Sequence, residues 1–377
     1  MKKTLFLLLI VLLVHCKQRY EIPTNSPVTG YLVVEGHINS GGGPTTFVLS
    51  RTVKLSGSRN NVTELNAHVQ VEDQNNIVFP LLDKGKGLYS ADALNFNPAQ
   101  KYRLRIRTAA GKDYLSDFVE LKKTPPIDSI NWKWEGDGVH IYVNAHDDLN
   151  NTRYYLWNYE ETWEYNSAFP TSLKYENGKV LPRTTEEQIY KCWSGQLSTN
   201  ILISSTVKFT KDIVNLNPLL NLPTGSRKLS VLYSILIKQY GVSKEAYSFL
   251  ENMKKNTESL GSIFDAQPSE LKGNIHAVNN PDEPVIGFVT AGNVAEKRIF
   301  IKRSELPGWP YTFACADPDT LVFNNPVSIR NFYVIGNYVP ISEEFGLFGL
   351  IGWNSNVIGC IDCRQLGGTT VKPAFWP

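Results

Sequence analysis

Residues 102–108 read YRLRIRT, and this short stretch gives the clearest structural pattern in the chain. Tyr102, Leu104 and Ile106 alternate with three arginines, so the apolar side chains face one side of an extended strand and the charged side chains face the other. A period of two with one wet face is typical of a strand that covers a core on one side only. The stretch therefore predicts a β-sheet with one buried and one solvated face.

Runs of the same kind fill the chain from Tyr31 to about Lys123. They are rich in β-branched and aromatic residues, and turn signals such as Gly41-Gly42-Gly43-Pro44 separate them. Besides the first stretch, the runs are YLVVEG (31–36), TTFVLS (45–50), AHVQVED (67–73), IVFPL (77–81) and YLSDFVEL (114–121). About six or seven strands in this length are typical of a small immunoglobulin-like or transthyretin-like β-sandwich, which we assign to residues 29–123.

Thr124-Pro125-Pro126 marks the predicted boundary to a second domain, residues 124–377, because consecutive prolines remove backbone donors and favour a stiff linker. This part is also β-rich. Its runs are INWKW (130–134), VHIYVNA (139–145), YYLWNYEETWEY (154–165), QIYKCW (188–193), NILISST (200–206), LSVLYSILIKQYGV (229–242), PVIGFVTAG (284–292) and KRIFIKR (297–303). The length of the runs at 154–165 and 229–242 favours a large twisted sheet or an open barrel over a second small sandwich.

One amphipathic helix is predicted in the second domain, over residues 243–259. Ser243 can cap its N-terminus, and Glu245 lies in the first turn, where the helix dipole favours a negative charge. We expect its apolar stripe to pack on the sheet, with docking of a partner as the alternative. The stripe consists of Ala246, Phe249, Leu250 and Met253.

The N-terminus predicts export and attachment to lipid. Two lysines precede ten apolar residues, 5–14, a segment that is too short to span a bilayer but has the length of a secretory signal. Cys16 follows where a bacterial lipoprotein receives diacylglycerol, although His15 replaces the usual small residue before it. We therefore predict a lipoprotein signal peptide at 1–15, a lipidated Cys16 and a tether at 16–28, with a plain secretory leader as the alternative.

The charge balance excludes one class of partner. The chain carries 38 Lys+Arg and 36 Asp+Glu, and removal of the two leader lysines leaves 36 of each sign. A balanced chain has little electrostatic attraction for DNA or RNA, so nucleic acid is not an expected partner. Hydrophobic residues make up 42% and charged residues 20%, which fits a globular protein rather than a disordered or multi-span membrane protein.

Four further cysteines, Cys192, Cys315, Cys360 and Cys363, occur in what we predict to be an exported chain. An even number in an oxidising compartment favours disulfides, with three connectivities. The CxxC motif at 360–363 would also fit half a zinc site or a redox pair, but no second CxxC and no nearby histidine accompanies it. Our preferred pairing is Cys360–Cys363 with Cys192–Cys315.

No motif predicts an enzyme, a cofactor or a metal centre, since the nucleophile elbow, HExxH, the phosphate loop and GxGxxG are missing from the sequence. His146-Asp147-Asp148 is expected to be a solvated turn, and Asp317-Pro318-Asp319 a capped turn rather than a weak cation site. Glu160, Glu161 and Glu164 lie close together on a predicted strand. Paired carboxylates can hydrolyse sugars, but neighbours in a strand point to opposite faces.

Several tryptophans offer flat surfaces on which a sugar or a protein partner can stack. A position in the core is the favoured interpretation. The residues are Trp132, Trp134, Trp157, Trp163, Trp193 and Trp353.

Long stretches of the chain resemble a known family. They are YLVVEGHI (31–38) with LSRT (49–52), YYLWNYEETWEY (154–165), YKCW (190–193), YSILIKQYGVSKEAYSFLENMKKNTESLGSIFDAQPSELKGNIHAVNNPDEPVIGF (233–288) and CIDCRQLGGTTVKPAFW (360–376). Together they resemble the Bacteroidota lipoproteins catalogued as domain of unknown function 4249, over nearly all of the chain from Tyr31 to Trp376.

The resemblance implies an outer-membrane lipoprotein without a defining enzyme activity, often encoded beside a TonB-dependent receptor. It thus implies a binding or accessory subunit of such a receptor or of another nutrient-uptake complex. Lys17, Gln18 and Arg19 replace the acidic residues often taken as a surface-export signal, so we expect the cell surface with the periplasmic face as the alternative. Two other functions stay open, a surface hydrolase acting on glycans or peptides and a structural envelope protein.

Overall fold

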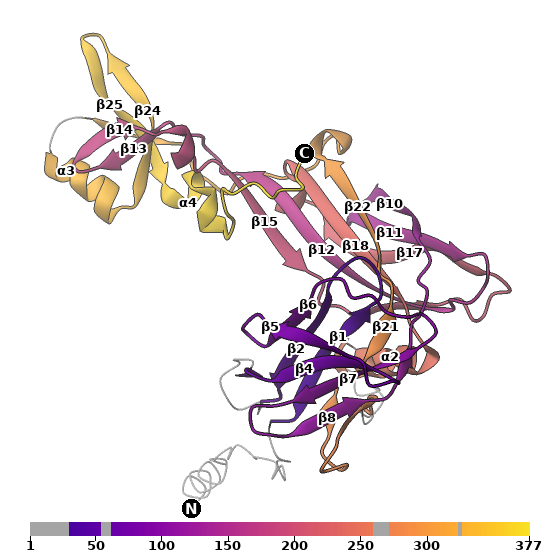
Figure 1. The fold of residues 1–377 in the computed structure, drawn as a ribbon. Helices are drawn as coiled ribbons and strands as arrows, with labels where there is room; N and C mark the ends of the chain where they lie inside the picture. The colour runs from indigo at the N-terminus through magenta and orange to yellow at the C-terminus, as the bar shows by residue number, and fades with distance from the viewer. Residues whose placement is uncertain (1–29, 54–61, 259–270, 323–325) are drawn as a thin grey trace, which may run out of the picture.

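The computed structural model describes residues 30–53, 62–258, 271–322 and 326–377, and it shows a mainly β protein, as the sequence predicted. The strands form three bodies that follow one another along the molecule (Figure 1). The predicted signal peptide (1–15) and tether (16–28), with Cys16, lie outside the described residues. Among the helices of the described ranges, none is long and apolar enough to cross a bilayer.

The first body, which we call the sandwich, is a twelve-stranded sheet that curls almost closed around its own core. The stretch YRLRIRT forms β7 between β4 and β8, and Tyr102, Leu104 and Ile106 are at most 1% exposed, which confirms the predicted period of two. The strands are β1 (Leu32–Asn39), β2 (Thr45–Arg51), β3 (Val62–Thr63), β4 (His68–Asp73), β5 (Val78–Asp83), β6 (Leu88–Ala91), β7 (Lys101–Arg107), β8 (Asp113–Ser116), β9 (Val119–Glu120), β19 (Ile275–Ala277), β20 (Val285–Ile286) and β21 (Thr290–Gly292).

Three strands of the sandwich come from far along the chain. β19 pairs antiparallel with β8, whereas β20 and β21 pair in parallel with β1. The run PVIGFVTAG (284–292), predicted as a single strand of the second domain, therefore belongs to the sandwich as two strands. The break includes Gly287, whose φ of +145° suits glycine and where a Cβ would lie 2.3 Å from the carbonyl oxygen of Val34.

The second body, which we call the central layer, consists of two sheets packed face to face. The long runs at 154–165 and 229–242 form neighbouring strands, β12 and β18, of its five-stranded sheet, and a three-stranded sheet covers their inner face. Its elements are β10 (Ile127–Glu135), β11 (Gly138–Asp147), β12 (Tyr154–Asn166), β15 (Lys191–Leu197), β16 (Leu202–Ser205), β17 (Asp212–Pro223), β18 (Leu232–Gly241) and β22 (Ala295–Lys302), with short 3-10 turns η2 (Arg227–Leu229) and η3 (Arg303–Glu305).

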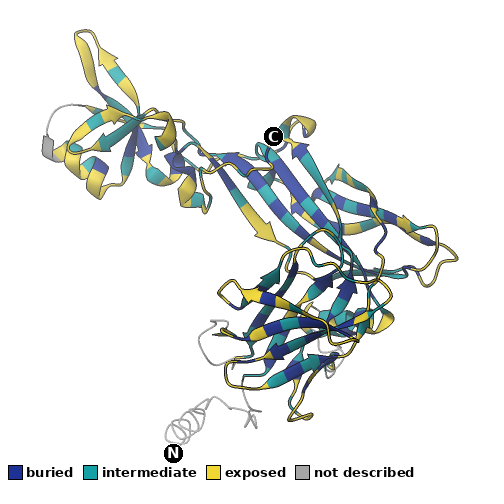
Figure 2. Ribbon diagram, in the orientation of Figure 1, coloured by how far each residue is buried: buried dark blue, intermediate teal, exposed yellow. Residues whose placement is uncertain are grey.

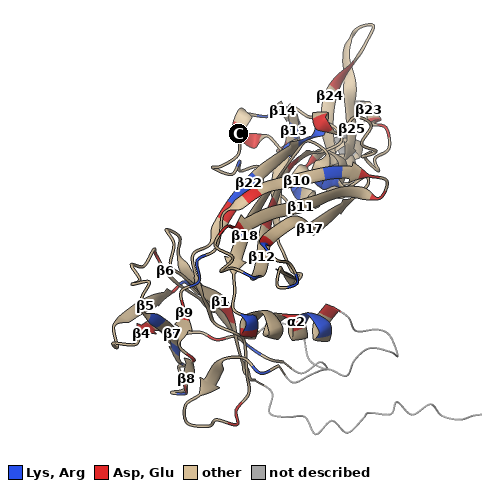
Figure 3. Ribbon diagram, turned by 90° about the vertical axis from the view of Figure 1, so that its right-hand side faces the viewer, with Lys and Arg blue, Asp and Glu red and all other residues tan. Residues whose placement is uncertain are grey.

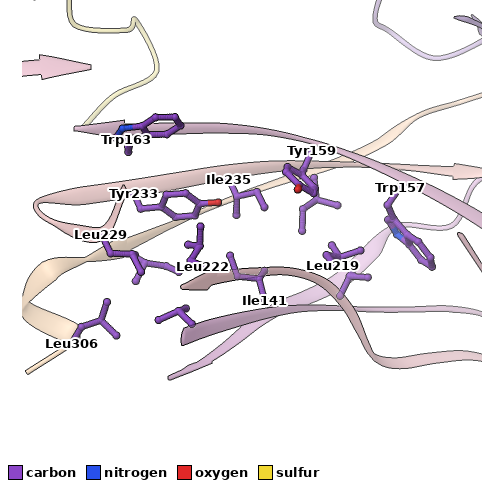
Figure 4. Close-up of a cluster of buried hydrophobic side chains, with 14 of the residues drawn as sticks. Ile141, Trp157, Tyr159, Trp163, Leu219, Leu222, Leu229, Tyr233, Ile235 and Leu306 are labelled. Atoms are coloured by element: carbon purple, nitrogen blue, oxygen red, sulfur yellow. The ribbon is translucent and has the colours of Figure 1, made fainter. Parts of the chain in front are cut away.

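The core of the central layer contains several aromatic side chains. Trp157 and Tyr233 of the larger sheet face Ile141 and Leu222 of the smaller one, and all four are at most 1% exposed (Figure 4). Figure 2 shows the buried residues alternating along these strands. The larger sheet and its cover therefore share one hydrophobic core.

The chain passes between the sandwich and the central layer three times, after β9, after β18 and after β21, and these crossings are hydrogen-bonded to one another. Thr124, at the predicted domain boundary, is buried; its backbone N–H donates to Asn293 Oδ1 at 2.8 Å and its hydroxyl donates to the Asn293 carbonyl at 2.5 Å. The backbone N–H of Gly241 in β18 donates to the same hydroxyl at 2.9 Å. The junction is thus a bonded contact rather than a free linker.

The third body, which we call the head, lies at the end of the molecule opposite the sandwich (Figure 1). Its own core is small and centres on Ile189, Val339 and Ile361. Its elements are β13 (Leu173–Glu176), β14 (Lys179–Pro182), the 3-10 turn η1 (Thr185–Glu187), β23 (Asp319–Val322), α3 (Pro326–Arg330), the π-helical turn η4 (Asn331–Ile335), β24 (Tyr338–Gly346), β25 (Gly349–Val357), α4 (Ile358–Ile361) and the 3-10 turn η5 (Cys363–Leu366).

All four predicted disulfide cysteines are paired, but the preferred pairing was wrong. The bonds join Cys192 to Cys363 and Cys315 to Cys360. The two cysteines of the CxxC motif lie on successive short helical turns and therefore reach different parts of the chain. Backbone hydrogen bonds hold each turn in place: the N–H of Cys363 donates to the carbonyl of Ile189, and the carbonyl of Cys360 accepts from the N–H of a residue that follows β12. The motif therefore clamps the head to the central layer.

Helix α2 (Lys244–Glu258) forms where the sequence predicts it, with residue 259 outside the described ranges. The hydroxyl of Ser243 accepts a hydrogen bond from the backbone N–H of Ala246 at 3.2 Å, as expected for an N-cap. Ala246 and Phe249 of the apolar stripe are buried, and the other two residues of the stripe are half-buried. The stripe thus packs on the protein, as favoured.

Candidate functional site

A groove with a volume of about 710 Å³ lies between α2 and the adjoining strands of the sandwich. One wall comes from β9, β19 and β21, and the other comes from the first half of α2. Residues near 117–122, 241–252 and 271–291 therefore meet here. Sequence reasoning missed this site because the segments lie far apart along the chain and carry no shared motif.

The groove combines aromatic rings with paired charges. The rings of Phe249 and Phe288 contact each other at a centroid distance of 5.6 Å. Lys101 and Lys122 both pair with Glu120, at 3.1 and 3.6 Å, and the hydrogen bond from Lys101 lowers the pKa of the Glu120 carboxyl. These charged side chains are exposed, so their pairing adds little to stability and they remain available to a ligand.

Internal hydrogen bonds fix the wall opposite α2. The side chain of Asn274, which is 5% exposed, accepts from the backbone N–H of Val289 at 2.8 Å and donates to its carbonyl at 2.9 Å. His276 of β19 contacts Asp117, which directly follows the neighbouring strand β8, at 3.2 Å. Because one wall is bonded in this way and the other is a capped helix, the site is largely pre-formed, as ligand sites usually are.

The lining residues favour binding of a neutral polar molecule. Three lysines and three carboxylates line the groove together with His276, so it offers no excess of either charge to a polyanion or a polycation. Thr290 contributes a hydroxyl, and His37 bonds to it at 2.7 Å. The lowered pKa of His37 makes this imidazole a poor base for activating the hydroxyl at neutral pH.

His37 of β1 joins the sandwich to the central layer. Its Nε2 donates to the Gly292 carbonyl at 2.8 Å, its Nδ1 accepts from Thr290, and its ring packs edge-on against Tyr240 of β18 at 5.1 Å. Burial among these groups lowers the pKa of His37 to about 4. The imidazole is therefore neutral in the folded protein at neutral pH.

Acid should weaken the protein through His37. A histidine has an unperturbed pKa of about 6.5, so the unfolded chain binds the proton first; the stability contributed by neutral His37 is complete above about pH 6.5 and is lost as the pH falls towards about 4. We expect a loss of about 3 kcal/mol across this window. Denaturant unfolding of the wild type and His37→Gln at several pH values measures it.

The exposed His276→Gln variant is the matched control for this measurement and should keep the wild-type pH dependence. An identical acid profile for His37→Gln and the wild type would contradict the assignment to His37.

A second cavity, of about 680 Å³, lies at one end of the central layer. His146 contacts Asp128 at 2.7 Å, and this hydrogen bond raises the pKa of the imidazole. His146 and Asp147 end β11 and Asp148 begins the turn, and Asp147 caps that turn by accepting three backbone N–H bonds from residues 149–152. Buried Asp212 accepts from the hydroxyl of Tyr155, and burial raises the pKa of that tyrosine.

A cluster with metal-ligand chemistry forms on the hairpin between β10 and β11. Ligand atoms of Glu135, Asp137 and His140 lie within 4.8 Å of one another. Each already has a partner: His140 bonds to Asp137 at 2.8 Å, and Glu135 pairs with Lys133 at 2.9 Å. The spacing Glu-x-Asp-x-x-His across a tight turn was the signal available in the sequence.

The three glutamates considered for hydrolysis lie on opposite faces of β12, as their spacing predicts, and all are paired. Glu160 pairs with Lys238 at 2.5 Å on the outer face, and buried Glu161 pairs with Lys228 at 2.8 Å on the inner face. Glu164 pairs with a lysine of β15 at 3.0 Å and accepts from the indole N–H of Trp376 at 2.9 Å. Each of the three carboxylates therefore has a lysine partner in the folded protein.

The tryptophans considered as stacking surfaces pack mostly in the interior. Trp157, Trp163 and Trp193 are buried, and Trp132 and Trp134 pack against the same core. Trp353 lies in the head, where its ring contacts an aromatic neighbour at 6.4 Å. Asp319, of the predicted capped turn at 317–319, accepts from the hydroxyl of Tyr338 at 3.0 Å at the start of β23.

The chain matches a known family model. A family model described as "Domain of unknown function (DUF4249)" matches residues 17–298, which include the whole sandwich, α2 and most of the central layer. The segment of the head that contains β23, β24 and β25 follows the matched range. No curated protein matches the chain.

Proposed function

The chain belongs to the family catalogued as DUF4249, and from this premise we propose that it is a lipid-anchored outer-membrane protein that acts as a binding or accessory subunit. Its partner in this proposal is a TonB-dependent receptor or another nutrient-uptake complex. The groove between α2 and the sandwich carries the proposal, because it is pre-formed, polar, charge-balanced and lined with aromatic rings. Such a site suits a sugar or a peptide that is captured rather than altered.

The pairing of the carboxylates supports a binding role over the hydrolase alternative. A glycosidase needs one carboxyl group to donate a proton and a second to attack or to activate water. Glu160, Glu161 and Glu164 are each held by a lysine, and Glu161 also accepts a hydrogen bond from the hydroxyl of Tyr233 at 2.9 Å. These contacts occupy the groups that the hydrolase alternative requires.

Purification from the membranes of the native host in mild detergent tests the accessory role. We expect the full-length protein to carry a receptor with it in a fixed ratio. A protein recovered alone, in large excess over every outer-membrane receptor, would contradict the proposal.

The lipid anchor has its own test in Cys16→Ser. Loss of the thiol removes the acylation site, so the variant should leave the membrane fraction and lack the mass of the acyl chains. Ser26→Ala, in the same predicted tether, is the matched control and should stay membrane-bound. Retention of Cys16→Ser in the membrane would place the anchor elsewhere.

A further inference from the structure

The hairpin formed by β24 and β25 carries large apolar side chains into solvent at the tip of the head. The last strand pair is Gly346 with Gly349, so Leu347 and Phe348 form a two-residue turn. Leu347 is 97% exposed, Phe348 is fully exposed, and Phe345 just before them is 63% exposed. The tip is therefore a contiguous apolar surface rather than a scatter of single residues.

Leu347 and Phe348 are not residue types that favour a two-residue hairpin turn. Two-residue hairpin turns favour asparagine, aspartate and glycine, which suit both the backbone and water. Leucine and phenylalanine gain nothing from either in the free protein, and their burial against another surface would be strongly favourable. The composition of the tip thus points to an interaction outside the chain.

The base of the hairpin is rigid, which suits a docking element. The Tyr333 ring stacks on Tyr175 at 4.7 Å, and its hydroxyl contacts Ser355 of β25 at 3.1 Å. Asn354 of β25 donates to Glu344 of β24 at 2.9 Å. The Cys192–Cys363 disulfide ties the head to β15 of the central layer, and the Cys315–Cys360 disulfide ties α4 of the head to the segment that precedes β23, so little freedom is lost when the tip binds.

Charge and position indicate the kind of partner. Residues 338–357 contain Glu343 and Glu344 but no lysine or arginine, and the outer part of the hairpin carries no charge in Figure 3. An anionic membrane surface repels such an element, whereas a protein socket with an apolar floor and basic rim complements it. The tip also lies at the opposite end of the molecule from β1, the strand that follows the proposed anchor (Figure 1).

We infer that Phe345, Leu347 and Phe348 form the docking tip through which the head binds an apolar socket, rimmed by basic residues, on the receptor. This inference rests on the proposed function and adds to it the surface that makes the contact. The groove, on the far side of the central layer, stays open to ligand while the tip is occupied (Figure 1).

The test compares Leu347→Ser/Phe348→Ser with Leu149→Ser/Leu197→Ser in the full-length, membrane-anchored protein. Leu149 and Leu197 are 69% and 66% exposed, so the control also removes two exposed apolar side chains, from another part of the molecule. We expect the tip variant to bind the receptor about a hundredfold more weakly, measured by titration of the purified components, and the control to bind as the wild type does. Both variants should unfold as the wild type does, because these side chains are exposed.

Photo-crosslinking from a benzophenone side chain adds the location. A benzophenone at position 348 should label the receptor on a peptide that lines the apolar floor or the basic rim of the socket. The same group at position 149 should not label the receptor. Receptor binding that survives the tip substitution would overturn the inference and leave the proposed function standing. If the wild-type protein binds no receptor at all, both the inference and the proposed function are contradicted.

Two further measurements distinguish the receptor from the two other partners that the tip could bind, a lipid membrane and a second copy of the chain. Flotation of the purified protein with vesicles of phosphatidylethanolamine and phosphatidylglycerol would overturn the inference if the wild type floats and the tip variant does not, because the tip would then bind lipid. Sedimentation would overturn it if a dimer of the wild type disappears with the same substitution, because the tip would then bind a second copy.

Discussion

Replacing Cys192 and Cys363 together with serine should lower the free energy of unfolding by about 5 kcal/mol. The bond closes a segment of 171 residues, so its loss releases a large conformational entropy in the unfolded chain. It also removes a covalent tie between β15 of the central layer and the helical turn that supports the head. Guanidinium unfolding under non-reducing conditions, followed by tryptophan fluorescence, measures the loss.

The second disulfide supplies the matched control. Cys315 and Cys360 close a segment of 45 residues, for which the same chain-entropy argument gives about 4 kcal/mol. The first double variant should therefore be the less stable of the two, and a reversed order would contradict the entropic account. Cleavage before Asp362 checks the pairing directly, since it should leave Cys360 and Cys363 in separate disulfide-linked fragments.

Glu161→Ala should cost about 4 kcal/mol of stability, the second large effect. Glu161 has a side chain that is 1% exposed, and it accepts from the Lys228 ammonium at 2.8 and 2.9 Å and from the Tyr233 hydroxyl at 2.9 Å. Its removal leaves a buried hydroxyl and a partly buried cation without their acceptor. The cost lies in the middle of the usual range because Lys228 is 21% exposed and can turn towards water.

Glu160→Ala is the matched control, one residue away on the outer face of the same strand. Its side chain is 37% exposed and that of its partner Lys238 is 28% exposed, so the substitution should cost at most about 1 kcal/mol. Equal losses for the two variants would contradict the structural role of Glu161. A glycan-hydrolysing activity that disappears in Glu161→Gln while stability is retained would instead restore the hydrolase alternative.

The elements that the sequence predicts well are those in which periodicity and burial agree. β7 alternates without interruption, and β12 places Trp157, Tyr159 and Glu161 on its inner face at the expected spacing. The α2 helix has an N-cap, a suitable first-turn charge and an apolar stripe, so local signals specify it fully. In these places a short window of sequence contains all of the physical information that is needed.

The elements that the sequence does not predict are those in which the alternating pattern of apolar and polar residues is interrupted. β17 contains Pro218 and Pro223, and Leu216 within it has a φ of +46°, which disturbs the alternation. The strand exists because it is an edge strand on β11, where a missing N–H is tolerated, and because Asn144 accepts from the backbone N–H of Leu216 at 2.6 Å. Such tertiary contacts produce no periodic pattern in the sequence from which the strand could be predicted.

The candidate groove and the disulfide pairing share a second reason for being missed. Both depend on which distant segments meet, and composition carries no record of that. The CxxC spacing favoured a local bond, yet the two cysteines lie on separate short helical turns and bond to residues 45 and 171 positions away along the chain. The groove needs the strands at 275–292 to return to a sheet that begins at Leu32.

The late position of β19, β20 and β21 in the sequence also determines when the sandwich can be completed. A chain that emerges N-terminus first exposes β1 and β8 as unpaired edges until β10 to β18 and α2 have all been synthesised, because their neighbours β19, β20 and β21 come only afterwards. During that interval another nascent copy can offer the same strands. Folding of this protein therefore carries a risk of strand exchange between chains, because β1 and β8 wait for partners that come late in the sequence.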